Sequence, residues 1–414
     1  MHDRLTTRRL FLQAAAALPA IATSPAQAAP DKDPELLSHR EFGLDPKLTY
    51  FNTASAGLTP KRVLARTIEA WQKLETDPVP MAYYSEPGTV VSAADEVRGK
   101  AARLIGCEAD EILLTRGTTD GITTLSSSIR LRAGDRVLLS DQEHEGGEVG
   151  WLHRERRDGI LVDRVNIPIG DHDTSAITGR FADAVRPSTR VICVSHVLSP
   201  TGLRMPIAEI AAMARSRNIL CVVDGAQAVG GLPVDVRALG CHAYATSGHK
   251  WLMGPKGTGF TYVSRDAGEL IDPPQWLLGR NFGSNSAGLG PLTLMVGLGQ
   301  AIDDLAAVGL ARVEAHNVGL RNRFYSGLSK ISDLRLVSPP PGLSATALVA
   351  AELPGRIDSK LMRERMHDRH GVVVKMAEKR WFNGIRFSPH IYNDEYQVDA
   401  AIAALRAELG NFST

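Results

Sequence analysis

The sequence predicts an α/β protein, in which a mainly parallel, seven-stranded sheet sandwiched by helices is followed by a smaller α+β C-terminal domain. Between about residues 90 and 265, short β-branched runs alternate with segments whose apolar residues recur at helical spacing. This alternation is typical of strand–helix–strand units, which build parallel sheets covered on both faces. The apolar run 219–223 also fits a strand that is buried on both sides.

Each predicted strand of the large sheet is a short run rich in β-branched and other apolar residues. The expected strands are 111–115, 136–140, 162–168, 190–196, 219–223, 243–246 and 259–263. Between most of them lie helical patterns such as 207–214, in which apolar residues would share one face.

A second domain is predicted after a long helical pattern that runs from Leu294 to about Leu328. Beyond it, the strand-like pieces 345–352, 371–375 and 384–388 alternate with two helical patterns. We therefore expect 29–75 to pack on the small domain, 76–300 to form the large domain, and 301–414 to form the small domain with the linking helix first.

The composition gives no electrostatic reason to expect a nucleic-acid or membrane partner, because 47 Lys and Arg residues balance 46 Asp and Glu residues. The four cysteines, Cys107, Cys193, Cys221 and Cys241, form no CxxC motif and have no metal-ligand spacing. Free, buried thiols are expected, without a disulfide.

The N-terminus has the three regions of an export signal. It reads TTRRLFLQ around Arg8 and Arg9, continues as an Ala-rich apolar run to about Ile21, and ends in the small-x-small site Ala26-Gln27-Ala28. The paired arginines resemble a twin-arginine (Tat) signal, and the apolar run is too short to span a bilayer. We predict that 1–28 is a Tat signal peptide, that the Tat translocase exports the chain to the periplasm or beyond, and that no membrane anchor remains. A chance Arg-Arg pair is the alternative.

The segment SGHKWLMGPKGTG places Lys250 directly after a predicted strand and before a Gly-rich turn. The carboxyl ends of parallel strands meet at the edge where α/β proteins bind ligands, so this lysine can project into a cleft. A desolvated, unprotonated amine there can form an imine with an aldehyde. Taken by itself, Lys250 could equally be a solvated loop lysine.

Asp224 ends the apolar strand of the motif VVDGAQAVG. A carboxylate at such a buried position is costly unless it is paired. The ring nitrogen of pyridoxal 5′-phosphate (PLP) is a suitable partner, because a carboxylate beside it keeps the ring protonated and electron-withdrawing. Without PLP, Asp224 could be a helix N-cap or a metal ligand, although no other acid or histidine lies nearby in the sequence to complete a metal site.

Two further motifs can contact such a cofactor. In TRGTTDG a strand runs through small residues into a helix, whose free N–H groups, with the hydroxyls of Thr118 and Thr119, would hold a phosphate. A capped strand–helix turn has the same pattern. In DQEHEGG, the His144 imidazole could stack on the pyridine ring, or could be a surface loop residue.

The order of TRGTTDG, QEH, VSHVLSPTG, VVDGAQAVG and SGHKWLMGPKGTG resembles the class V aminotransferase family of fold type I PLP enzymes. Within that family the sequence is most similar to isopenicillin N epimerase-like proteins, with FNTASAG near the start and RFSPHIYN near the end. The resemblance covers nearly the whole mature chain. It implies PLP as cofactor, a fold type I large domain and a homodimer.

By position, the resemblance implies that Lys250 forms the imine, Asp224 pairs with the ring nitrogen, and His144 stacks on the ring. Gln227 would contact the phenolic oxygen, and His196 would lie near it. The expected phosphate ligands are Thr118, Thr119, Ser247 and His249. At the substrate end, Arg386 would pair with the α-carboxylate through its two-pronged guanidinium, and Asn52 and Ala54 would line the cleft. Arg386 could alternatively be a surface arginine.

The sequence departs from the family pattern at two places. Cysteine desulfurases need a nucleophilic cysteine on a small-domain loop, and no cysteine follows Cys241, so we expect that the chain is not a cysteine desulfurase. Many family dimers also present a Gly-Thr pair to the partner's phosphate, and this pair falls at Gly288-Leu289 here. Either Ser284 or Ser286 substitutes for it, or the contact is lost.

These observations predict an exported PLP enzyme that acts at the α-carbon of an amino acid or an amino-acid-containing metabolite, as an epimerase or an aminotransferase. A C–S or C–N lyase that tailors a secreted natural product is an alternative. A catalytically silent PLP-binding protein is a third, against which the intact set of Lys250, Asp224 and His144 argues.

Overall fold

The computed structural model describes residues 39–268, 270–273, 290–343 and 346–412, and its largest sheet has seven strands. In spatial order they are β2 (Ile112–Thr115), β8 (Gly259–Val263), β7 (Ala243–Ser247), β6 (Leu220–Asp224), β5 (Thr189–Ser195), β3 (Arg136–Ser140) and β4 (Leu161–Val165). Strands β7 to β4 pair in parallel, while β8 runs antiparallel to both of its neighbours. The predicted mainly parallel, seven-stranded sheet is confirmed.

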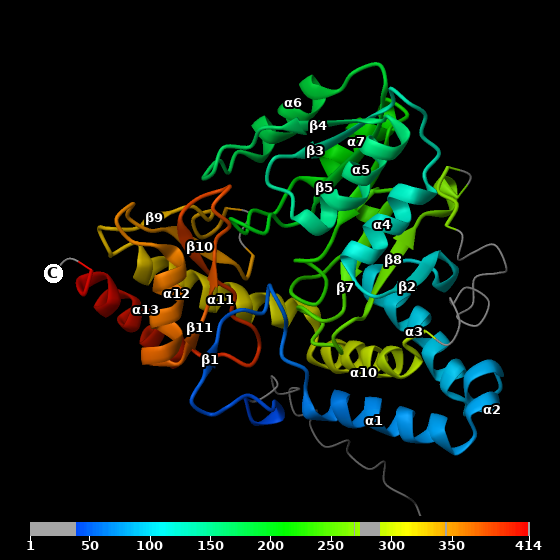
Figure 1. Cartoon of the computed structure of the whole chain (residues 1–414), viewed down its shortest axis with the longest axis horizontal. Coiled ribbons are helices and arrows are strands. Elements are labelled where there is room, and N and C mark those ends of the chain that lie inside the picture. The colour runs from blue at the N-terminus through cyan, green and yellow to red at the C-terminus, as the bar shows by residue number, and fades with distance from the viewer. Residues whose placement is uncertain (1–38, 269, 274–289, 344–345, 413–414) are drawn as a thin grey trace, which may run out of the picture. The chain divides into compact units, whose positions relative to one another are not determined.

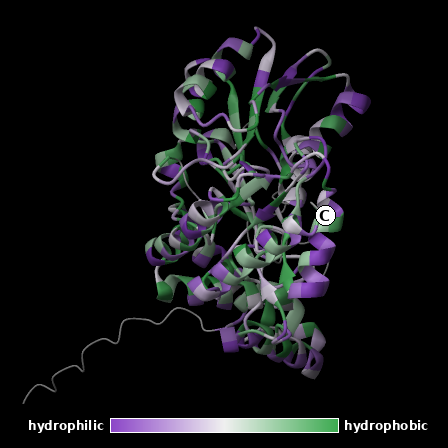
Figure 2. Cartoon of the chain, turned by 90° about the vertical axis from the view of Figure 1, so that its left-hand side faces the viewer, coloured by the Kyte–Doolittle hydropathy of each residue, from purple (hydrophilic) through white to green (hydrophobic). Residues whose placement is uncertain are grey.

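Helices cover both faces of this sheet, because its strands carry apolar side chains on both sides (Figure 1). Along β5, Val191 and Cys193 belong to the core shared with α4 (Thr118–Ser128) and α5 (Glu145–Asp158). Their neighbours Ile192 and Val194 belong to the core of the opposite face. The helices of that second core include α3 (Val90–Ile105), α6 (Thr174–Ala184), α7 (Ile207–Ser216), α8 (Val236–Leu239) and α10 (Leu292–Val308). In Figure 2 the apolar colour runs along the strands.

The C-terminal part has a sheet and core of its own. Four antiparallel strands lie in the order β12 (Lys375–Met376), β13 (Gly384–Phe387), β10 (Val349–Glu352) and β9 (Arg335–Leu336). They pack with α11 (Leu310–Leu328), α12 (Ser359–His370) and α13 (Glu395–Gly410). Phe324 lies at the centre of this core, with its ring 4.9 Å from that of Phe51 and 4.5 Å from that of Phe387.

The N-terminal segment divides between the two cores. Strand β1 (Thr49–Tyr50) pairs in parallel with β11 (Val372–Val373) of the small domain. Farther along, α1 (Lys61–Thr76) packs against α10, and α2 (Pro78–Tyr83) against α3. Within the described residues 39–75 of the predicted segment, β1 therefore contacts the small domain, as expected, whereas α1 packs against α10. Short 3-10 helices lie at His39–Glu41, Ala109–Glu111 and Arg265–Ala267.

The long helix expected from Leu294 to Leu328 is two helices. The chain turns by 80° between α10 and α11, at Gly309, whose φ of 87° is a backbone conformation that favours glycine. Within the described residues no single helix is both long and apolar enough to cross a membrane, and α10 and α11 meet that criterion only as this bent pair.

Several predictions concern residues outside the described ranges. The Tat signal and its cleavage site lie there, as do Ser284, Ser286 and Gly288-Leu289. The four cysteines lie within the described ranges and all four are free; Cys193, Cys221 and Cys241 are buried as expected, whereas Cys107 is only half-buried.

Candidate active site

A cavity of about 630 Å³ lies where the carboxyl ends of the central strands meet the small domain. Its walls come from the ends of β5, β6 and β7, the start of α4, and strands β12 and β13. This is the edge at which open α/β sheets bind ligands. The predicted site residues that line it are Ala54, Thr118, Thr119, His144, Asp224, Gln227, Ser247, His249, Lys250 and Arg386.

Two predicted site residues, His196 and Asn52, have other placements. Ser195 and Val197 line the cavity, but His196 between them does not, because successive side chains of an extended chain point to opposite sides. The buried His196 ring instead lies 2.9 Å, Nδ1 to Oη, from Tyr244. Asn52 Oδ1 accepts a hydrogen bond of 2.7 Å from Ser55 Oγ, and it is Ser55 that lines the cavity.

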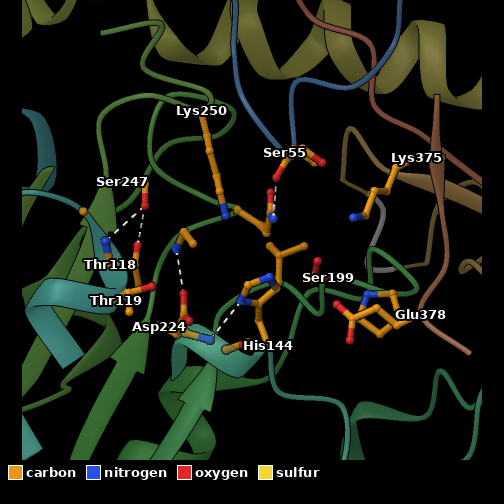
Figure 3. A pocket seen from close by; sticks show the side chains of 18 of the residues that line it. Ser55, Thr118, Thr119, His144, Ser199, Asp224, Ser247, Lys250, Lys375 and Glu378 are labelled. Carbon is orange, nitrogen blue, oxygen red and sulfur yellow. Dashed lines mark hydrogen bonds between the residues drawn. The ribbon is translucent and has the colours of Figure 1, made fainter. Parts of the chain in front are cut away.

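Lys250 lies in the turn that follows β7, and its amine points into the middle of the cavity (Figure 3). The N-terminal segment 57–59, called the strap below, holds this turn in place. Gly57 N donates to the His249 carbonyl over 2.8 Å. Lys256 Nζ completes the strap by donating to Gly57 O over 2.7 Å and to Thr59 Oγ1 over 2.8 Å. Burial lowers the pKa of Lys250 to about 8, although the nearby Asp224 carboxylate opposes the shift. An appreciable share of the amine is therefore neutral and nucleophilic near pH 7.

Asp224 ends β6 with its carboxylate buried at the floor of the cavity. Oδ1 accepts a hydrogen bond of 2.9 Å from Ala226 N, whereas Oδ2 has no hydrogen bond within the described ranges. Burial raises the pKa of Asp224, and the charge of Lys250 acts in the opposite direction. No group of three His, Cys, Asp or Glu side chains in the described chain is placed to hold a metal ion. A cation or protonated nitrogen of a ligand is the partner that Oδ2 can accept from.

His144 forms the wall opposite Lys250 (Figure 3). It is the N-cap of α5, and its Nδ1 accepts a hydrogen bond of 3.0 Å from Gly146 N. Burial and the positive charge of Lys250 lower the pKa of the imidazole. The ring is therefore neutral near pH 7, and its proton is on Nε2 because Nδ1 accepts the hydrogen bond from Gly146 N.

The start of α4 forms an anion-binding corner. Gly117 is the N-cap and offers no side-chain cap, so the N–H groups of the first turn that follow Thr118 stay available to an anion. Thr118 N donates to Ser247 Oγ over 3.1 Å, and the two hydroxyl oxygens of these residues lie 2.9 Å apart. His249 Nδ1 is buried and has no hydrogen-bond partner in the described part of the chain.

These features fit PLP. The corner at α4 supplies hydroxyls, the uncapped N–H groups that follow Thr118 and the unpartnered Nδ1 of His249 for a phosphate, and the open Asp224 Oδ2 suits a protonated ring nitrogen. Two glycines keep the space between the α4 corner and Asp224 open. A Cβ on Gly147 would lie 3.0 Å from Asp224 Oδ2, and a Cβ on Gly146 would lie 2.3 Å from Thr119 Oγ1. Gln227 is fixed at the edge, donating to Ala54 O and accepting from Trp251 Nε1, both over 2.9 Å.

Arg386 on β13 brings a buried guanidinium to the other end of the cavity. Its Nη1 donates to Ser199 O and Ser199 Oγ, both over 2.7 Å, and its Nη2 donates to Ser55 Oγ over 3.4 Å. Nε has no partner among the described residues. Burial lowers the pKa of Arg386 to about 10, so the group remains charged near neutral pH. Such a group suits a carboxylate.

The sequence-based prediction did not include Ser55, Ser199 or Lys375, which also line the cavity. The two serines stand in the motifs FNTASAG and VSHVLSPTG, so those motifs carried a signal for them. No motif in the sequence pointed to Lys375, because its position in the cavity depends on the pairing of β12 with β13.

The fold and this site define a class. Residues 49–401 match the family model Aminotransferase class-V, and the chain belongs to that family. Its cofactor is PLP, as the family and the fit of the cavity indicate. Isopenicillin N epimerase from Amycolatopsis lactamdurans is 32% identical over 395 residues, which cover 89% of this chain and 97% of the relative.

Cysteine desulfurases are also similar to this chain. A probable cysteine desulfurase from Methanothermobacter thermautotrophicus is 29% identical over 307 residues, covering 71% of this chain and 76% of the relative. The apo cysteine desulfurase of Thermococcus onnurineus NA1 shares the fold, with a TM-score of 0.80, 21% identity, and coverage of 90% of this chain and 97% of that chain. The expectation that excluded the desulfurases is therefore wrong. It rested on the position of one nucleophile, whereas the scaffold is common to both groups.

Proposed function

We propose that this protein uses PLP to exchange the α-proton of an amino acid or an amino-acid-containing metabolite, as an epimerase or an aminotransferase. The observation that supports this function best is the convergence on one cavity of the Lys250 amine, the Asp224 carboxylate and the Arg386 guanidinium. The similarity to isopenicillin N epimerase from Amycolatopsis lactamdurans supports the same chemistry.

The roles of the residues follow from their surroundings. When bound, PLP supplies an electron-withdrawing ring that lets a proton leave the α-carbon. Asp224 Oδ2 would keep the ring nitrogen protonated, and the N–H groups and hydroxyls at the start of α4 would hold the phosphate. Lys250 Nζ would hold the cofactor and would accept and return a proton at the substrate α-carbon, for which a pKa of about 8 is well matched.

Arg386 orients the substrate in this proposal. Ser199 holds Nη1 through two hydrogen bonds, so the guanidinium is already fixed before a carboxylate arrives. His144 lies across the cavity from Lys250, where it would cover one side of a bound ring and limit the access of water.

Borohydride reduction of the native protein tests the attachment. The cofactor should be recovered on the peptide that spans Lys250, and Lys250→Ala should lose both the label and the cofactor absorbance. Recovery of the cofactor on a different lysine would refute the assignment.

Incubation with amino acids in deuterated water tests the reaction. Deuterium at the α-carbon with inversion and no keto acid indicates an epimerase, and a keto acid indicates an aminotransferase. Release of sulfide or ammonia would favour the alternative, a C–S or C–N lyase or a desulfurase. A cofactor-loaded protein that exchanges no α-proton with any substrate would leave the silent PLP-binding protein.

We also propose that the protein is exported through the Tat pathway and works in the periplasm or outside the cell. The support is the order of Arg8-Arg9, the apolar run and Ala26-Gln27-Ala28 in the sequence. Replacing Arg8 and Arg9 by lysine should leave precursor in the cytoplasm, and normal export of this variant would rule out the twin-arginine route.

A homodimer is part of the proposal. The outer face of α1 exposes Leu64, Ile68 and Trp71, by 45%, 57% and 57%, at helical spacing, which favours a covered surface. Ile68→Glu should shift the mass of the purified protein from dimer to monomer in light scattering. A wild-type protein that is monomeric would contradict the proposal.

A further inference from the structure

A second cation lies beside Arg386 at the substrate end of the cavity. Strands β12 and β13 are antiparallel, and their register places Lys375 directly opposite Arg386. Residues that face each other in this way project from the same side of a sheet. Both line the cavity, and Figure 3 shows the Lys375 amine directed into it.

The charge of Lys375 is not balanced by a neighbour. Like charges directly opposite each other destabilise a sheet. Yet among the described residues neither Lys375 nor Arg386 forms an ion pair within 4.0 Å, and the Lys375 amine has no hydrogen-bond partner. The negative charge of Glu378 acts on Arg386, whereas Lys375 forms no ion pair, so the cavity favours an anion that can contact both cations.

The loop between β12 and β13 carries an acidic residue, Glu378, that already has a partner. Glu378 lines the cavity, but its carboxylate accepts a hydrogen bond of 2.9 Å from Arg380 Nε. Arg380 is in turn fixed to the large domain, since its Nη2 donates to Glu143 O over 2.9 Å and its Nη1 lies 3.3 Å from Glu148 Oε2. This anchoring keeps Glu378 with Arg380 rather than with Lys375.

The remaining wall near Lys375 is largely apolar, with Met376, Ala377 and Trp381 in the lining. A substrate side chain can therefore run along an apolar surface and place a charge at the lysine. Arg386 is already assigned to the α-carboxylate, so the charge at Lys375 belongs to a second group.

We propose that Lys375 is a specificity residue that binds a second carboxylate of the substrate, so that the enzyme acts on amino acids or amino-acid conjugates with two carboxylates. This inference rests on the proposed function for the role of Arg386. It adds the class of substrate, a dicarboxylic amino compound, which the anchoring chemistry at Lys250 does not determine.

A matched pair of ligands without an amino group isolates this subsite. The holoenzyme is titrated by calorimetry with glutarate and with its monoamide, which has the same length and one charge less. Glutarate should bind about tenfold more tightly, the usual order for a charge-assisted contact. Lys375→Gln should abolish the preference by weakening glutarate alone, and Lys375→Arg should retain it.

Lys379→Gln is the matched control, because this lysine of the same loop is 75% exposed, pairs with Asp358, and does not line the cavity. Its preference should equal that of the wild type. Equal binding of the two ligands by the wild type, or an unchanged preference in Lys375→Gln, overturns the proposal. If Lys375→Gln binds neither ligand, the Lys375→Arg variant decides. A preference for glutarate in Lys375→Arg supports the subsite, and its absence overturns the proposal.

These outcomes are separable from failure of the proposed function. Neither ligand can form an imine, so the preference does not depend on reaction at Lys250. A protein that prefers glutarate but carries no cofactor on Lys250 after borohydride treatment would refute the PLP chemistry and keep the anion subsite.

Discussion

Replacing Gly57 by alanine should disturb the turn that carries Lys250, although Gly57 does not line the cavity. Gly57 passes against the backbone of Lys250, and a Cβ at this position would lie 1.9 Å from the Lys250 carbonyl oxygen and 2.9 Å from its carbonyl carbon. Its own N–H donates to His249 O over 2.8 Å, and Lys256 holds its carbonyl. The backbones of Gly57 and Lys250 cannot move apart without breaking these hydrogen bonds.

The size of the effect follows from this geometry. Ordinary van der Waals contact begins at 3.4 Å. The two backbones must therefore separate by about 1.5 Å in the variant to relieve the steric repulsion. Overpacking of this kind costs about 1–3 kcal/mol in the free energy of unfolding. A shift of about 1 Å at a reacting group can also lower turnover by about 10²-fold.

Thermal melting and the cofactor absorbance band measure the two effects. Gly57→Ala should melt a few degrees below the wild type and show a weaker or shifted band. Gly43→Ala is the control, because nothing lies within 4 Å of a Cβ at that position. If Gly57→Ala matches the wild type in both measurements while carrying the cofactor on Lys250, the proposed close approach is wrong.

Three other outcomes are expected. Capture of PLP by the apoprotein should rise about tenfold between pH 6 and 7 and level off above the Lys250 pKa of about 8, because only the neutral amine reacts; a midpoint near the ordinary lysine value would contradict the effect of burial. Asp224→Asn removes the charge that opposes the shift, so this midpoint should fall further, and α-proton exchange should drop by about 10²-fold or more while cofactor remains bound; full activity would refute the ring-nitrogen role. Arg386→Gln should raise KM for carboxylate substrates by roughly 10–100-fold with a smaller effect on kcat, and unchanged steady-state kinetics would remove that role.

Much of the site could be predicted because its residues follow strands. Asp224 ends β6, Lys250 lies in the turn just after β7, and all parallel strands deliver their carboxyl ends to one edge. Their convergence on one cavity therefore follows from local pattern together with the parallel topology. The phosphate corner at Thr118 is readable for the same reason, since it joins β2 to the start of α4.

The direction of side chains just beyond the end of a strand was not predicted from their position in a motif. His196 stands next to Ser195 and Val197, which line the cavity, yet it turns to Tyr244, because one residue along an extended chain reverses the face. The break at Gly309 was likewise hidden in a continuous apolar pattern, since helical spacing continues on both sides of it.

The sequence by itself determined the order of strands and helices, the family, and the residue types able to hold PLP, because these depend on local periodicity and on motifs only a few residues long. Only the tertiary structure decided that Gly57 touches the backbone of Lys250 and that Lys375 faces the cavity opposite Arg386. Such contacts join residues that are distant in the chain. They are set by strand register and by the packing of one domain on the other, which no local pattern encodes.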